Sequence, residues 1–236
     1  FWFDSSTHTY WLDKKRLTGV TTILGVLAKP ALIQWAANEA VKFLDSRYDP
    51  DLFQDRDEFN KLLEEARTAW KDKRDEAALW GTITHAGVEV WIKTKEIPAK
   101  VTTDKGEFEV LPKHKEAIER FVKWAGKNKV KFLESEKKVY NPELFVAGTA
   151  DFVCEMGDRK YIGDLKTGKS VYYEAFVQCA AYRQLLQLMG EKDFDGSLIV
   201  HLPQIGELET HERFDHETDW NVFEAALLIY RTKQQI

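Results

Sequence analysis

The sequence has few cysteines, no long apolar run and no excess of positive charge, and each absence excludes a class of protein. Its two cysteines, Cys154 and Cys179, form no C-x-x-C pair and no zinc or iron–sulfur spacing. A reducing compartment, the cytoplasm in the simplest case, is therefore expected. No apolar run is as long as a membrane span, and no signal-peptide pattern opens the chain. The formal net charge of −5 argues against a protein that coats nucleic acid through its overall charge, but it permits a local basic groove.

The chain also lacks linkers, internal repeats and low-complexity segments. No stretch rich in glycine, proline or serine divides its 236 residues, a length that a single α/β domain often has. We therefore expect one domain over residues 1–236, with a mainly helical N-terminal elaboration over 1–129 and a strand-rich core over 130–236. The chain begins at Phe1 rather than at methionine, so a trimmed N-terminus that once carried an organelle-targeting segment is compatible with the sequence.

Hydrophobic periodicity and turn residues predict the order of the elements. A hairpin should open the chain, with aromatic runs on either side of residues 4–8. Helices are expected at about 30–44, 59–79, 82–93, 112–127, 173–189 and 220–233, with Gly81 separating the second from the third. Irregular segments are expected at 45–57 and 96–110, and strands at 130–140, 146–168, 197–202 and 208–214. This mixture predicts an α/β fold with a small mixed central sheet flanked by helices.

The segment 146–168, V-A-G-T-A-D-F-V-C-E-M-G-D-R-K-Y-I-G-D-L-K-T-G, predicts a hairpin with unusual charges. A two-residue turn at Gly157 would place Asp151 directly opposite Asp164 and put Lys166 on the same face. Like charges directly across a strand pair are destabilising, so something cationic should neutralise them. A divalent metal would do so, because hard cations prefer carboxylate oxygens. The alternative is a solvated hairpin face on which Lys166 screens the two acids, and a turn one residue longer would undo the pairing.

Further polar residues accompany this hairpin along the chain. The run G-T-I-T-H-A-G-V-E places His85 and Glu89 four residues apart on one helical face. Glu136 lies on the strand before the hairpin, and Gln178 and Tyr182 are four residues apart on the helix after it. Each has an ordinary alternative: a solvated histidine, a surface glutamate, and a packed Gln–Tyr pair.

Taken together, these motifs resemble the RecB-like branch of the PD-(D/E)XK nuclease superfamily. The order is G-x-x-x-H, then E, then G-x-x-D, then D-x-K-T-G, then Q-x-x-x-Y, from Gly81 to Tyr182. The opening L-T-G-V-T-T-I-L and L-I-Q-W-A-A-N are similar to phage-type members, and a mitochondrial genome-maintenance exonuclease also belongs to the family. The resemblance implies a restriction-endonuclease-like fold, with the catalytic core in residues 130–236. Relatives with an iron–sulfur cluster carry four cysteines around this core, so we expect no cluster here.

The resemblance also implies roles for single residues. His85, Asp151 and Asp164 correspond to metal ligands, joined by the main-chain carbonyl of Leu165, and Lys166 corresponds to the residue that orients or activates the attacking water. Glu136 corresponds to an acidic residue at the edge of the site, and Gln178 and Tyr182 correspond to the helix motif that supports the site and touches DNA. Independently of the resemblance, Lys169 and Arg183 are basic residues close to these motifs along the chain, and we expect them beside the site as DNA contacts.

These residue types predict phosphodiester hydrolysis with one or two Mg²⁺ or Mn²⁺ ions. The resemblance implies a DNA exonuclease of recombination, repair or replication that acts on ends and favours single strands. The partner is therefore DNA, single-stranded or with a free end, bound at a local basic surface. The alternatives are a flap endonuclease on the same core, a non-catalytic nuclease-fold DNA-binding subunit, and an α/β interaction protein with an incidental hairpin.

Overall fold

The structure is a computed structural model that describes residues 1–27, 29–49, 55–191 and 193–234. It separates into two compact units, Phe1–Leu27 with Trp80–Ile236, and Ala28–Leu79. The smaller unit lies within the helical N-terminal elaboration that the sequence predicts over residues 1–129. No helix among the described residues is long and apolar enough to cross a membrane.

The elements mostly follow the sequence prediction. The strands are β1 Trp2–Asp4, β2 Thr9–Leu12, β3 Lys15–Gly19, β4 Lys100–Thr103, β5 Gly106–Glu109, β6 Lys131–Asn141, β7 Val146–Met156, β8 Arg159–Lys166, β9 Gly196–His201 and β10 Glu209–Arg213. The helices are α1 Val20–Leu24, α2 Pro30–Ser46, α3 Arg56–Thr94, α4 Pro112–Lys127, α5 Tyr173–Leu188 and α6 His216–Lys233.

Two expectations about local structure were wrong. The segment expected to be irregular at 96–110 contains the β4–β5 hairpin. The helix break expected at Gly81 is absent: α3 runs without interruption from Arg56 to Thr94. The expected irregular segment 45–57 is shortened by α2 and α3, and its residues 50–54 lie outside the described part of the chain.

The larger unit confirms the predicted α/β fold, with a mixed sheet flanked by helices. Its main sheet has the order β1-β2-β3-β7-β8-β9-β10, and β6 also pairs with β7. The sheet is larger than expected because the three opening strands join it through the parallel pair β3–β7. Most neighbours are antiparallel, and β8–β9 is a second parallel pair.

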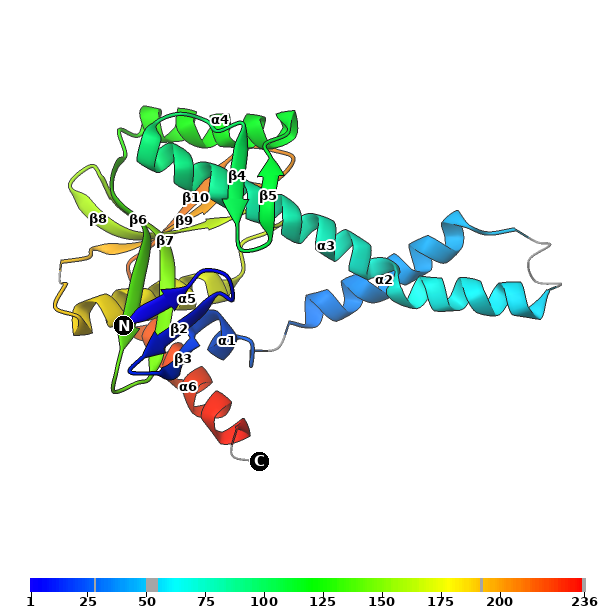
Figure 1. Cartoon of the computed structure of the whole chain (residues 1–236), viewed down its shortest axis with the longest axis horizontal. Helices are drawn as coiled ribbons and strands as arrows, with labels where there is room; N and C mark the ends of the chain where they lie inside the picture. Colours follow the sequence, from blue (N-terminus) through cyan, green and yellow to red (C-terminus); the bar gives the residue numbers. More distant parts are fainter. Residues whose placement is uncertain (28, 50–54, 192, 235–236) are drawn as a thin grey trace. The chain divides into compact units, whose positions relative to one another are not determined.

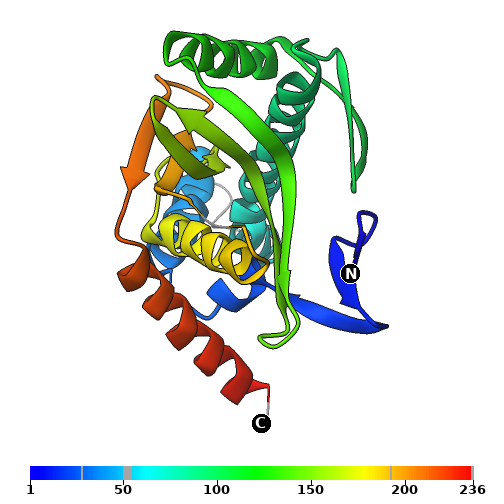
Figure 2. The same cartoon turned by 90° about the vertical axis from the view of Figure 1, so that its left-hand side faces the viewer.

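Helices cover both faces of this sheet (Figures 1 and 2). On one face α1, α5 and α6 bury an apolar cluster that includes Val177, Leu185 and Phe223. On the other face α4 and the C-terminal part of α3 bury a second cluster around Phe121 and Phe152. The central strands β7, β8 and β9 between these layers are therefore mostly buried, whereas β1, β6 and β10 remain more exposed.

The smaller unit consists of α2 and the N-terminal part of α3. Glu39 of α2 is 4% exposed and accepts hydrogen bonds from Lys42, at 2.9 Å, and from Lys73 of α3. Trp35 and Trp70 make an edge-to-face contact at 6.5 Å between ring centroids. A buried carboxylate paired with two ammonium groups and an aromatic contact thus join the two helices of this unit.

Candidate active site

The β7–β8 hairpin has the register that the sequence predicts. The strands pair from Met156 with Arg159 to Phe152 with Gly163, around a turn in which Gly157 has φ +63°. Positive φ favours glycine, which explains that residue in the turn. Asp151 and Asp164 come one position beyond the last of these pairs, so the predicted direct pairing of the two aspartates is not part of the ladder.

The site lies where the sheet parts along one edge of β7. On one side β7 pairs with β6 over its length. On the other side it pairs with β3 at residues 146 and 147 and with β8 at residues 152 to 156. Residues 148–151 between these segments therefore have no strand partner on that side, which leaves Asp151 free to turn its carboxylate toward groups outside the ladder.

Asp151 joins helix α3 to strand β8. Its Oδ2 accepts a hydrogen bond of 2.7 Å from the Leu165 N–H and lies 3.4 Å from Nδ1 of His85. Burial tends to raise the pKa of Asp151, but His85, Lys166 and the Leu165 N–H outweigh it and hold the pKa below its usual value. Burial likewise opposes the charge of His85, but Asp151 outweighs this effect and raises the pKa of the imidazole. Because the N–H and C=O of a strand residue face the same neighbour, the Leu165 carbonyl also points toward β7.

Asp164 lies deeper and is held by Lys166 and Gln178. It is 2% exposed, its Oδ2 lies 2.7 Å from Nζ of Lys166, and its Oδ1 accepts a 2.9 Å hydrogen bond from Nε2 of Gln178. Gln178 also accepts from Lys166 at 3.1 Å and donates to the Tyr182 hydroxyl at 2.9 Å. Burial raises the pKa of Asp164 to about 6, although Lys166 opposes this rise.

Glu136 occupies the β6 position opposite Asp151. Its neighbours Ser135 and Lys137 pair with Phe152 and Ala150, while Glu136 itself has φ +53°. A non-glycine residue in this left-handed region costs about 1 kcal/mol or more, and such strain is concentrated at functional sites. Burial, followed by the charge of Asp151, raises the pKa of Glu136, and Lys138 at 3.2 Å partly compensates.

A cavity of about 1130 Å³ opens above these residues, lined by His85, Glu136, Asp151, Gln178 and Tyr182 among others. Asp164 and Lys166 are not part of this lining, so they lie beneath it. The turn between β1 and β2 and the turn between β4 and β5 complete the walls. Sequence reasoning missed these two turns, because nothing local to residues 5–8 or 102–105 shows that they approach the hairpin. All lining residues belong to the larger unit.

Two residues expected beside the site lie elsewhere. Lys169 lines a second, smaller cavity. Arg183 donates to the Asp195 carbonyl at 3.3 Å and is partly desolvated, which lowers the pKa of its guanidinium. Both expectations rested on closeness along the chain, but a side chain next to Tyr182 on α5 points to a different face of that helix.

Gly81 explains how α3 approaches the D-L-K-T-G turn. A Cβ atom at this position would lie 2.9 Å from Oγ1 of Thr167, a separation that real Cβ atoms do not show. The glycine therefore permits a close contact that a larger residue would obstruct. This contact, rather than a helix break, accounts for the glycine four residues before His85.

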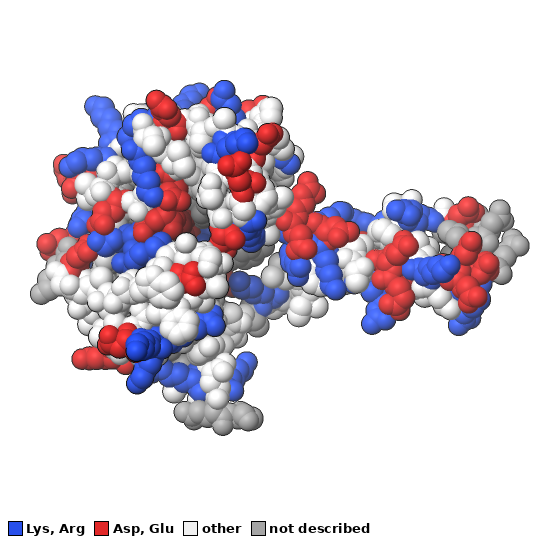
Figure 3. Space-filling model, in the orientation of Figure 1, with Lys and Arg blue, Asp and Glu red and all other residues white. Residues whose placement is uncertain are grey.

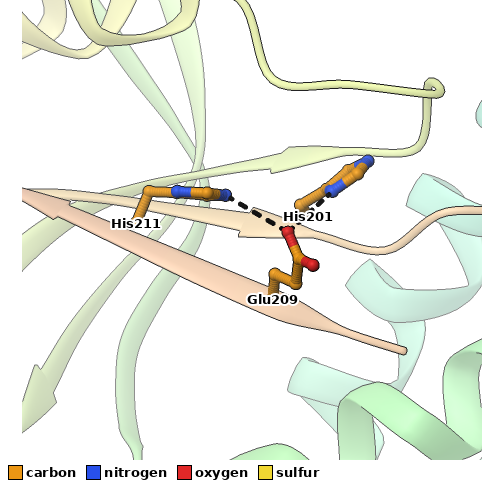
Figure 4. A group of neighbouring side chains, drawn as sticks. All are labelled: His201, Glu209 and His211. Atoms are coloured by element: carbon orange, nitrogen blue, oxygen red, sulfur yellow. Dashed lines mark ion pairs between the residues drawn. The ribbon is translucent and has the colours of Figure 1, made fainter. Parts of the chain in front are cut away.

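A second polar group, not anticipated from the sequence, lies on β9 and β10. Among the described residues, His201, Glu209 and His211 are a group whose metal-ligating atoms all lie within 4.8 Å of one another (Figure 4). His85, Asp151 and Asp164 are not such a group, because Asp164 turns to Lys166 and Gln178 while Asp151 turns to His85 and Leu165.

Comparison with known proteins identifies no family for the chain. No protein family matches the sequence, and no curated protein does. Seventeen chains of solved structures match. One of them, the crystal structure of SSO0001, has a TM-score of 0.30 and 13% sequence identity, over 48% of this chain and 57% of that one. The match spans less than two thirds of that chain, and similarity at this level carries no argument about fold or function.

Proposed function

We propose that this protein is a metal-dependent deoxyribonuclease of the RecB-like PD-(D/E)XK type, a DNA exonuclease that favours single strands. One observation carries the proposal. Asp164 is buried against Lys166 and Gln178, next to the pair of Asp151 and His85, where the sheet parts beneath a cavity. The residues of four separate sequence motifs thus meet at one place. Buried carboxylates beside a lysine in a cleft are typical of catalytic sites.

The donor groups fit a divalent cation. Asp164 is 2% exposed, and its Oδ2 is paired with the Lys166 ammonium at 2.7 Å. Two carboxylates and a main-chain carbonyl suit Mg²⁺, and the imidazole of His85 also suits Mn²⁺. Asp151, Asp164, His85 and the Leu165 carbonyl would hold the ion. When bound, it would shield the phosphate charge and lower the pKa of a water molecule.

The side chains of this chain supply the remaining roles. Lys166 lies next to Asp164, outside the cavity lining. Burial opposes its positive charge, but Asp164 and Asp151 outweigh this effect and raise the pKa of the ammonium above its usual value. Lys166 can therefore orient a nucleophile and stabilise the negative charge that develops on the phosphoryl oxygens. Gln178 fixes Lys166 and Asp164 through its two amide atoms, and Tyr182 fixes Gln178. In this arrangement Gln178 and Tyr182 act as positioning residues.

The cavity walls suit an unpaired strand. Phe3 and His8 line the cavity and are not fully buried, and aromatic side chains can stack on bases irrespective of sequence. Lys138 lies over the ring of Phe3 at 4.3 Å and offers a phosphate contact. On the face shown in Figure 3, basic and acidic side chains of the larger unit are interspersed, so DNA contacts would be local.

Digestion of end-labelled DNA tests the proposal. Single- and double-stranded linear DNA and circular single-stranded DNA are incubated with Mg²⁺, Mn²⁺ or EDTA. We expect metal-dependent cleavage of linear single strands, reduced by about 10²–10³-fold in Asp164→Asn and Lys166→Ala. Asp158→Asn in the exposed hairpin turn and Lys160→Ala at the far end of β8 are matched controls that should cleave normally. Cleavage that persists in EDTA, or equally in all four variants, would refute the mechanism, and cleavage of circles would show an endonuclease.

A further inference from the structure

His201, Glu209 and His211 lie on one face of the sheet because of strand register. His201 of β9 pairs directly with Glu209 of β10, and His211 follows Glu209 by two residues. Directly paired residues and residues two apart share a face. Three side chains with metal-ligating atoms therefore point the same way from two adjacent strands, as Figure 4 shows.

The distances within this group are too long for hydrogen bonds but suit a shared ion. Oε2 of Glu209 lies 3.8 Å from Nδ1 of His201 and 3.8 Å from Nε2 of His211. Hydrogen bonds between nitrogen and oxygen are about 2.7–3.2 Å long. Two ligands bound at about 2.1 Å to one tetrahedral ion lie about 3.4 Å apart, so only small movements separate this group from a coordination shell.

The second nitrogen of His201 determines what its first nitrogen offers. Nε2 of His201 lies 2.7 Å from the carbonyl oxygen of Gly168. A carbonyl only accepts, so Nε2 carries a proton, and in the neutral ring Nδ1 presents a lone pair toward Glu209. Histidines that bind metals almost always donate their other N–H to a carbonyl or carboxylate in this way. His201 is 7% exposed, so the main chain holds this orientation in a buried setting.

His211 gives an independent indication. The His211 side chain is 40% exposed, but its Nε2 atom has essentially no accessible surface and, among the described residues, makes no hydrogen bond. A ring nitrogen covered in this way without a partner is unfavourable, and native structures rarely leave one. This nitrogen lies next to Glu209 Oε2 and faces the same side as His201.

We propose that His201, Glu209 and His211 form a binding site for a borderline divalent cation such as Zn²⁺, separate from the Asp151–Asp164 site. Two imidazoles and one carboxylate are a ligand set that zinc uses when one coordination position stays open to water or substrate. The three residues line a cavity of about 360 Å³, which can supply that position. Lys169 adds a positive charge and Glu207 a negative charge to the lining of the same cavity.

The ion would also connect the two sites through the backbone. Lys166 pairs with His201 across β8 and β9, and Gly168 lies two residues beyond Lys166. A cation bound to His201 would restrict the motion of its imidazole ring. Because this ring donates a hydrogen bond to the Gly168 carbonyl, the ion would also stabilise the turn that follows Lys166. The rival arrangement is an ion pair between Glu209 and protonated histidines, which would need no metal.

Calorimetric titration of the full chain with Zn²⁺, in saturating Mg²⁺, distinguishes the two. We expect the Asp164→Asn protein to bind zinc like the wild type, and Glu209→Gln and His211→Ala to bind at least tenfold more weakly. These two positions are used because His201 is buried and its replacement could prevent folding. Glu207→Gln is the matched control, since it removes the same charge from the same cavity and should leave zinc affinity unchanged.

Thermal unfolding gives a second measurement on the same proteins. At a zinc concentration about 100 times Kd, the melting temperature of the wild type should rise by roughly 5–10 °C, and that of Glu209→Gln should not. No zinc binding by the wild type, or equal binding by all variants, would overturn the proposal in favour of the ion pair. These outcomes are independent of DNA cleavage, so this proposal and the proposed function can fail separately.

Discussion

A methyl group at Gly163 should destabilise the larger unit through Phe152. A Cβ atom at position 163 would lie 1.9 Å from Cε2 of the Phe152 ring. Ordinary carbon contacts are about 3.5–4.0 Å, so the ring would have to move by at least about 1.6 Å. The Phe152 side chain is fully buried, and the rings of Phe121 and Phe132 pack around it at centroid distances of 6.4 and 5.4 Å. The ring therefore has little room to move.

Two opposing effects set the size of this change. Replacing glycine by alanine in a strand gains about 0.5–1 kcal/mol of stability, because the unfolded chain loses freedom. Overpacking a core costs about 1–3 kcal/mol and more where the overlap is large. We therefore expect Gly163→Ala to lower the free energy of unfolding by about 2 kcal/mol. Because Phe152 and Gly163 adjoin Asp151 and Asp164, any nuclease activity should fall as well.

Urea denaturation measures this prediction, with two further proteins as controls. Gly126→Ala on α4 has no atom near the new methyl group and should be neutral or more stable by up to about 1 kcal/mol. In a Phe152→Leu background, Gly163→Ala should cost less, because the smaller side chain leaves space. A Gly163→Ala protein within 0.5 kcal/mol of the wild type, or additive effects in the double variant, would refute the packing argument.

Three other perturbations should have measurable effects. Burial, with help from Arg183, lowers the pKa of His216 from 6.5 to about 4, so the unfolded chain takes up this proton first as the pH drops. The full shift would lower the free energy of unfolding by about 3 kcal/mol at pH 4, and solvent screening of the partly exposed ring reduces this to about 2 kcal/mol; His216→Asn should show a correspondingly shallower fall in urea denaturation. Asp219 accepts from Arg213 and from Tyr173 while 2% exposed, so Asp219→Ala should cost about 3 kcal/mol in the same assay. Gly81→Ala should reduce DNA cleavage, whereas Gly81→Ala with Thr167→Ala should restore it, because the alanine at 167 removes the contacting Oγ1.

The sequence predicted most elements because their signals are local. Gly157 with its flanking alternation identified the β7–β8 turn and its register, which ends one position before Asp151 and Asp164. Pro112 and the apolar spacing after it predicted α4 with its observed bounds. The same local reasoning failed at Gly81, where a contact with Thr167 accounts for a glycine in the middle of a continuous helix. Helix propensity is a weak indicator when tertiary packing favours the residue.

The parts of the site that were missed depend on register and on distant contacts. Lys169 was expected beside the site because it closely follows Lys166, yet it lines the cavity of the second polar group. His201 and Glu209 belong to strands whose pairing no single sequence specifies, so their approach could not be predicted. The β4–β5 hairpin was missed because its strands are short and mostly polar, with a single apolar pair, Val101 with Phe108, to indicate a buried face.

The register of the whole sheet places both candidate sites on its α5 face. The β7–β8 hairpin places Asp164 and Lys166 on the same face as Asp151. Lys166 pairs with His201 of β9, and His201 pairs with Glu209 of β10, so these residues lie on that face as well. The carboxylate-rich end suits a hard cation, and the imidazole-rich end suits a borderline one. Lys166 lies between the two candidate cation sites in the order of the strands, so its ammonium group would disfavour an ion shared by both. The same face of the sheet would therefore hold two different metal ions, and each ion would stay with its own set of ligands.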